Sequence, residues 1–238
     1  MENVVVDLDT VDFGNLRAHI EVNLPDWRDP RGIRHDHAVL LTIGVAAVLT
    51  GARNITAIGE FAADLDDELC ARFGVRFHND CYQVPHPETF RRAFAGVDPE
   101  ALDRVIGSWL TENLPTEALR AIAIDGKTLR GAWNEHGRQV HLLAAMTHDE
   151  GAVLAQQEVP TDKTNEITMV RDLLGGLDLT GVVITADALH AQRDHAEFIA
   201  GEADGDYLFT VKGNQPTLLA AIQNIFDDGS FSPSVPDD

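Results

Sequence analysis

Two aspartates that follow runs of apolar residues are the strongest candidates for chemistry in this sequence. Asp125 comes directly after AIAI at 121–124, and Asp187 comes directly after VVITA at 182–186. Such runs predict buried strands, and ligands of open α/β sheets bind at the carboxyl ends of strands, so the two carboxylates can converge. Converging carboxylates are hard oxygen ligands for Mg²⁺ or Mn²⁺, and two such ions about 4 Å apart can hold the attacking and leaving oxygens of phosphoryl transfer.

A turn is the competing interpretation of the first aspartate. Asp125 and Gly126 form an Asp-Gly dipeptide, which is common in tight turns. From spacing alone the turn is favoured over the metal ligand, and both interpretations stay open when the residue is considered singly.

The lysines are few and share one kind of position. The chain has three, Lys127, Lys163 and Lys212, and each lies in a short polar segment after a predicted strand. This placement suggests contacts with backbone phosphates around one site. Asn165 and Glu166, which open the next predicted helix, are interpreted as its cap and as an acid in its first turn.

The histidines do not have the spacing of a metal site. His35 and His37 alternate, and His190 and His195 are five residues apart, which does not place two ligands on one helix face. We expect all four to be surface or loop residues. Trp133 is either an exposed stacking residue or, more commonly for this residue type, part of a core.

The elements that must position these residues fall into two regions, joined near residues 114–116. Residues 1–115 are predicted to be mainly α-helical, with helical patterns at 36–50, 54–65, 86–94 and 98–112. Residues 116–228 alternate strands and helices. The strands are predicted at 119–124, 140–147, 153–159, 182–186 and 207–211, and the helices at 166–174, 193–200 and 216–226. Residues 229–238 are expected to form a disordered tail.

Composition excludes several classes of protein. The chain has 238 residues and a net charge of -21, and 44% of its residues are hydrophobic, so it can bury a core and is not disordered throughout. The acidic balance argues against a general nucleic-acid coat protein but leaves room for a local basic groove. No membrane span, secretion signal or nucleotide-binding motif is apparent, and the two cysteines, Cys70 and Cys81, form no CxxC pair. We expect a cytoplasmic protein without a membrane partner.

Six segments from residue 29 to residue 219 occur in an order that is typical of one known family. They are DPRGIRHDHAVLLTIGVAAVLTGARNITAIGEFA (29–62), LRAIAIDGKTLRGA (119–132), VHLLAAM (140–146), DKTNEI (162–167), LTGVVITADALHAQRDHA (179–196) and DYLFTVKGNQPTLL (206–219). Together they resemble the ISAs-group insertion-sequence transposases, also called H-repeat-associated proteins, which are DDE transposases.

The resemblance implies a fold, a reaction and roles for particular residues. It implies an α/β fold with a ribonuclease H-like mixed sheet and flanking helices, preceded by the helical N-terminal region. Asp125 and Asp187 match the first two acids of the family's metal-binding triad, which holds Mg²⁺ or Mn²⁺ for hydrolysis and strand transfer at element ends. The partner is then double-stranded DNA, at element ends and target, in the bacterial nucleoid. Candidate DNA contacts are Lys127, Arg130, Lys212, Asn214 and Gln215.

One departure from the family pattern affects the expected activity. The family's third acid is a glutamate inside a His-Gly-Arg-x-Glu segment that follows the last strand and a helical insertion, and no such segment occurs between Lys212 and Asp238. The acids after Lys212 belong to no motif of that kind, and Glu166 opens a helix, which is not the family's position for that acid. We therefore expect a C-terminally truncated form.

Three functions remain open on the sequence. The chain is a DDE transposase or its N-terminal part; a non-catalytic fragment that binds DNA, forms homo-oligomers or inhibits an intact transposase by pairing with it; or a relic without function.

Overall fold

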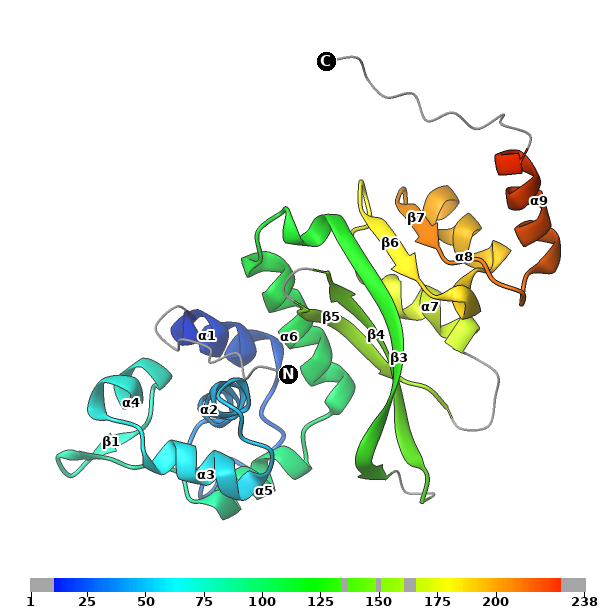
Figure 1. Cartoon of the computed structure of the whole chain (residues 1–238). Coiled ribbons are helices and arrows are strands. Elements are labelled where there is room, and N and C mark those ends of the chain that lie inside the picture. The colour runs from blue at the N-terminus through cyan, green and yellow to red at the C-terminus, as the bar shows by residue number, and fades with distance from the viewer. Residues whose placement is uncertain (1–10, 134–136, 149–150, 161–165, 228–238) are drawn as a thin grey trace. The chain divides into compact units, whose positions relative to one another are not determined.

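A computed structural model describes residues 11–133, 137–148, 151–160 and 166–227, with the side chains of 166–168 left aside. The chain divides into two compact units, Met1–Trp109 and Leu110–Asp238 (Figure 1). Within the described residues, no helix is long and apolar enough to cross a membrane.

The first unit is built mainly from helices around its own core. The helices predicted from periodicity are present as α2, α3, α5 and α6, whereas α1, α4 and a short hairpin of two strands were not predicted. The elements are α1 (Phe13–Asn23), α2 (His37–Leu49), α3 (Ile55–Ala63), α4 (Asp67–Phe73), β1 (Phe77–His78), β2 (Cys81–Tyr82), α5 (Pro87–Ala95) and α6 (Pro99–Asn113), the last of which ends in the second unit.

Local signals explain where several of these helices begin and end. The side chains of Asp12, Asn54 and Asp66 each accept a hydrogen bond from a backbone N–H in the first turn of α1, α3 and α4. Gly74 ends α4 with a φ of 76°, a left-handed conformation that costs glycine little. The helix α2 is apolar almost throughout and lies buried in the core, so tertiary packing rather than an amphipathic pattern stabilises it.

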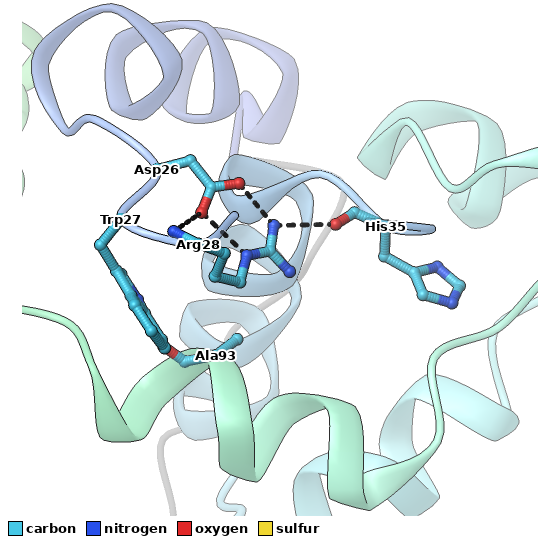
Figure 2. Close-up of polar contacts among 5 residues, drawn as sticks. All are labelled: Asp26, Trp27, Arg28, His35 and Ala93. Atoms are coloured by element: carbon cyan, nitrogen blue, oxygen red, sulfur yellow. Dashed lines mark hydrogen bonds and ion pairs between the residues drawn. The ribbon is translucent and has the colours of Figure 1, made fainter. Parts of the chain in front are cut away.

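The loop between α1 and α2 is held by a polar cluster (Figure 2). The Arg28 guanidinium donates to both carboxylate oxygens of Asp26, at 2.8 and 2.7 Å, and to the backbone carbonyl of His35 at 2.9 Å. The indole N–H of Trp27 donates to the carbonyl of Ala93 at 3.3 Å and so ties the loop to α5. These contacts order the loop between α1 and α2.

The second unit contains a five-stranded mixed sheet with the order β5-β4-β3-β6-β7. The strands β3, β4 and β5 pair antiparallel in chain order, and β6 and β7 then add on the other side of β3 in parallel. This is the α/β class expected from the sequence. The elements are β3 (Ala121–Trp133), β4 (Gln139–Thr147), β5 (Val153–Glu158), α7 (Glu166–Leu174), β6 (Val183–Ala186), α8 (Arg193–Glu197), β7 (Asp206–Phe209) and α9 (Pro216–Asp227), with 3₁₀ turns η2 (Ala118–Arg120) and η3 (Ala188–His190) and a π-helical turn η4 (Phe198–Glu202).

Strand β3 is much longer than predicted, and this overturns the turn interpretation of its aspartate. Asp125 pairs with Ala144 and Gly126 with Leu143 in the antiparallel ladder with β4, and Gly126 does not have a positive φ. The dipeptide is therefore extended. Pairing with a long neighbouring strand outweighs the local preference of Asp-Gly for a turn, because preferences in strands depend on context.

The core of this unit lies on one face of the sheet. Ile122, Ile124 and Ile184 are buried there together with apolar residues of α7, including Val170 and Leu174. Side chains alternate between the two faces of a strand, so the residues between these isoleucines face the other side.

Candidate functional site

The strand register brings the two predicted aspartates together. Ile124 of β3 aligns with Ala186 of β6 in the parallel ladder, and Asp125 and Asp187 are the next residue on each strand. Adjacent strands lie about 4.8 Å apart, so the two aspartates lie side by side where β6 ends and β3 continues. Asp125 follows the buried Ile124 by one residue, and Asp187 follows the buried Ile184 by three. An odd spacing along a strand places a side chain on the opposite face, so both aspartates point away from the core, and both are exposed.

The two carboxylates differ in what holds them. One oxygen of Asp187 accepts a hydrogen bond from the backbone N–H of Leu189 at 2.9 Å, so this side chain caps the turn η3 that begins after it. The carboxylate of Asp125 has no hydrogen-bond or ion-pair partner within the described part of the chain. One carboxylate is thus oriented by the backbone, and the other is available to a ligand with all of its oxygen lone pairs.

Two predicted DNA contacts lie in a segment that packs against the turn after Asp187. The side-chain amide of Asn214 donates to the carbonyl of Ala188 at 2.5 Å, and the amide of Gln215 donates to the side chain of Gln192 at 3.4 Å. The second contact is long and therefore weak. Asn214 thus supports the backbone that follows Asp187. The sequence gives no sign of this role, because it shows only a polar residue between a predicted strand and a predicted helix.

The three basic residues predicted to contact DNA are exposed. Lys127 lies two residues beyond Asp125 in a regular stretch of the ladder, so it shares the face of the two aspartates. Arg130 lies further along β3. Lys212 follows β7, whose last residue Phe209 aligns with Ala186, so the chain leaves β7 at the same end of the sheet as Asp187.

A histidine and a threonine on the same face were missed by the sequence analysis. The ring Nε2 of His148, just after β4, lies 2.8 Å from the hydroxyl oxygen of Thr185, two residues before Asp187. Strand alternation would have placed Thr185 beside Asp187, but no local pattern relates it to His148. This contact links the end of β4 to β6 across β3.

Some predicted residues fall outside the structural description. Lys163 and Asn165 lie among residues that are not described, as does the predicted tail. Glu166 is the first residue of α7, which agrees with its expected place in the helix, while its side chain is not described.

The four histidines are not surface residues, which corrects the expectation from the sequence. His35, His37, His190 and His195 are all buried. Burial lowers the pKa of His35, as do the neighbouring charges of Arg34, Arg76 and Arg28; burial also lowers the pKa of His37. Apolar neighbours far away in sequence decide burial, so the spacing of the histidines alone did not reveal it.

The residues present fit a divalent cation in one particular way. Within the described ranges, no group of three or more His, Cys, Asp and Glu side chains lies close enough together to hold a metal ion. Mg²⁺, however, commonly keeps several waters and takes one or two carboxylates together with phosphate oxygens of the substrate. Asp125 and Asp187, exposed and side by side, match that mode of binding.

Comparisons with known proteins relate both units to transposases. The family model described as "DDE_Tnp_1-associated" matches residues 20–110, and the model described as "Transposase DDE domain" matches residues 117–228. Two proteins of Escherichia coli K12 are similar over most of the chain. The "Putative transposase YncI" is 33% identical over 92% of this chain and 86% of its own, and the "H repeat-associated putative transposase YbfD" is 32% identical over 91% and 83%.

Other relatives are longer. The "H repeat-associated putative transposase YhhI" of the same strain is 32% identical over 91% of this chain, which spans 56% of that protein. A solved structure, a piggyBac transposase synaptic complex with hairpin DNA, matches 99% of this chain and 53% of its own with a TM-score of 0.40 and 13% identity.

Proposed function

The chain belongs to the DDE transposase family, and from that premise we propose that its second unit takes part in metal-dependent cleavage and transfer of DNA strands. One observation carries the proposal: Asp125 and Asp187 lie side by side on the open face of the sheet, one residue beyond aligned positions of two parallel strands. Their types and placement suit phosphate chemistry. Asp187 caps η3, but the Asp125 carboxylate has no structural contact among the described residues, and like charges at this spacing repel, so stability of the fold does not account for the pair.

Enzymes of this family use divalent metal ions, and Mg²⁺ or Mn²⁺ would be held here by Asp125 and Asp187. When bound, such an ion lowers the pKa of water and stabilises charge on the phosphoryl oxygens. Asp187 would contribute the oxygen that the Leu189 N–H leaves free, in a fixed orientation. Asp125, whose carboxylate has no other partner among the described residues, would adjust to the ion. The two aspartates then differ in rigidity while sharing one task.

The predicted DNA contacts divide into two groups under this proposal. Lys127, Arg130 and Lys212 are exposed cations near the carboxylates and would bind backbone phosphates. Asn214 and Gln215 would act chiefly by holding the turn that follows Asp187, because their amides are already engaged there. A DNA-bound form in which either amide turns to a phosphate would require that turn to loosen.

The test is cleavage of a plasmid that carries the DNA flanking the coding sequence. The purified chain is incubated with it in Mg²⁺ or Mn²⁺, beside the variants Asp125→Asn and Asp187→Asn and a control, Asp172→Asn, at an exposed acid of α7. We expect nicking or joining with wild type and the control and none with the other two variants. Cleavage that persists in both Asp125→Asn and Asp187→Asn would contradict the proposal.

A second candidate is a protein that binds DNA, or pairs with an intact transposase, without cutting. It is favoured by the absence of a third acidic ligand near the pair within the described ranges. Its test is a binding experiment. Binding to the terminal DNA, or co-purification with YhhI and loss of its activity, with no cleavage by this chain, supports the second candidate over the first. If the chain neither cleaves nor binds DNA and does not pair with YhhI, both candidates are ruled out, and a relic without function is left.

A further inference from the structure

Strands β3 and β4 continue past the rest of the sheet as a two-stranded ribbon (Figure 1). The parallel ladder with β6 ends at Ile124, and the β4–β5 ladder reaches only to Leu142, whereas β3 and β4 still pair at Thr128 with His141 and at Trp133 with Gln139. We call residues 127–133 and 137–142 the β3–β4 ribbon. Its register shifts between Thr128 and Trp133, an irregularity that adds residues to β3 and increases the twist.

The β3–β4 ribbon is positively charged in a strongly acidic chain. It carries Lys127, Arg130 and Arg138, and no acid occurs among its described residues; in the sequence from 126 to 142 the one acid is Glu135. The chain as a whole has a net charge of -21. Lys127 and Arg130 are exposed and have no ion-pair or hydrogen-bond partner within the part of the chain that is described. Cations concentrated on one projecting element attract a polyanion.

An exposed aromatic residue lies among these charges. Trp133 is 64% exposed, contrary to the burial that is more common for tryptophan. It contrasts with Trp109 of the first unit, whose indole N–H donates to Asn15 at 2.6 Å. Burying a tryptophan usually stabilises the fold, so one left in solvent beside arginines is typical of a surface that stacks on or packs against a ligand.

The β3–β4 ribbon begins next to the two aspartates. Asp125 and Lys127 lie on one face of the same strand, two residues apart, and the rest of the ribbon extends from there. A nucleic acid bound along the ribbon therefore passes the two aspartates. The cations also offset the repulsion between the carboxylates and a phosphate that approaches them.

We propose that the β3–β4 ribbon is a DNA-docking arm, which rests on the proposed function of strand cleavage and transfer. Lys127, Arg130 and Arg138 bind phosphates of duplex DNA, and Trp133 packs against the sugars and base edges of the groove. The width of the major groove admits a two-stranded β-ribbon, which fixes the arm along the duplex and brings one strand to the carboxylates.

The experiment measures binding of the full chain to a duplex of the flanking DNA in EDTA, at a series of salt concentrations. A triple variant changes Lys127, Arg130 and Arg138 to Gln, and a matched control changes Arg120, Arg171 and Arg193 to Gln, three exposed cations of the same unit. Because each phosphate contact on B-DNA contributes about 0.9 to the slope of log K against log salt, the ribbon variant should lower the slope by about 2.7 and the affinity by at least about ten-fold. The control should change neither.

A separate variant tests the aromatic contact. Trp133→Ala should weaken binding by about five-fold or more while leaving the salt slope unchanged, because stacking and packing release no counterions. In wild type, DNA should protect Trp133 from quenching by acrylamide, and Trp133→Phe should remove that protected component. Circular dichroism checks that each variant is folded.

The outcomes separate this inference from the proposed function. If wild type binds and cleaves DNA but the ribbon variant behaves like the matched control, the β3–β4 ribbon is not the docking arm and the proposed function stands. If wild type does not bind DNA at all, both fail. Equal losses in the ribbon variant and the control would show a response to net charge alone and would also overturn the inference.

Discussion

In the first unit Arg28 is held by Asp26 and by the carbonyl of His35, whereas in the second unit Asp125 and Lys127 are exposed and have no partner within the described ranges. Both pairs of opposite charges lie two residues apart in sequence. The first pair closes a loop and leaves nothing for a ligand. The second pair does nothing for the fold, so its charges are free to bind one. Partnership, more than residue type, separates a structural cluster from a candidate site.

The largest difference between these regions should appear when the carboxylates are removed. Under the proposed function, Asp125→Asn or Asp187→Asn should lower strand cleavage at least about 10²-fold, because each change would remove a metal ligand that contributes several kcal/mol in the transition state. The melting temperature should stay near that of wild type, since both side chains are exposed. Mn²⁺ titration followed by electron paramagnetic resonance gives the affinity of the metal site independently. A variant that keeps full affinity for Mn²⁺ would break the comparison.

Removing the structural pair should have the opposite profile. Arg28→Ala should destabilise the first unit by about 2 kcal/mol, because hydrogen bonds to charged groups are lost and the Asp26 carboxylate keeps its partly buried place without a partner. Arg31→Ala, at an exposed position of the same loop, is the control and should change stability little. Urea unfolding followed by the fluorescence of Trp27 and Trp109 measures the effect. Loss of Mn²⁺ binding in Arg28→Ala would contradict the assignment of separate roles.

Asn214 lies between these two extremes, since it is a structural residue inside the candidate site. Asn214→Ala should cost about 1 kcal/mol of stability, the usual net value of one hydrogen bond. It should also weaken Mn²⁺ binding a few-fold, because the turn that orients Asp187 loses its support. Gln215→Ala is the matched control, and its effect should be smaller because its contact is long. Equal Mn²⁺ affinity in wild type and Asn214→Ala would limit this residue to a role in folding.

The smallest effect should come from acid acting on the first unit. Burial lowers the pKa of His35 and His37 below the ordinary value of about 6.5, so the unfolded chain binds protons in a range where the folded unit does not. The stability contribution is complete above about pH 6.5 and is lost as the pH falls from there through the folded pKa values. Asp26, whose pKa is lowered mainly by its hydrogen bond with Arg28, responds only in stronger acid, below about pH 3.8.

Urea unfolding between pH 7.5 and 5 tests this dependence. The tryptophans of the first unit report on it, and His37→Gln removes part of the proton uptake. We expect the variant to have a flatter pH profile than wild type. If the stability of wild type does not decline below pH 6.5, the two histidines do not take up protons on unfolding. The comparison between the two units would then depend only on the charged pairs Asp26–Arg28 and Asp125–Lys127.

The sequence alone determined the features that depend on near neighbours. Apolar runs predicted the strands that carry Asp125 and Asp187, and helical periodicity predicted α2, α3, α5 and α6, because backbone preference and amphipathic spacing act over a few residues. The ordered motifs identified the family. Short elements with weak patterns, such as α4 and the hairpin of β1 and β2, were not predicted.

Only the tertiary structure decided which of these features meet. The register between β3 and β6 sets Asp125 beside Asp187 although 61 residues of sequence separate them, and pairing with β4 carries β3 past an Asp-Gly dipeptide that favours a turn. The same long-range packing buries four histidines, directs the amide of Asn214 to Ala188 and leaves Trp133 in solvent. Strand register and burial depend on distant partners, and no local period encodes them.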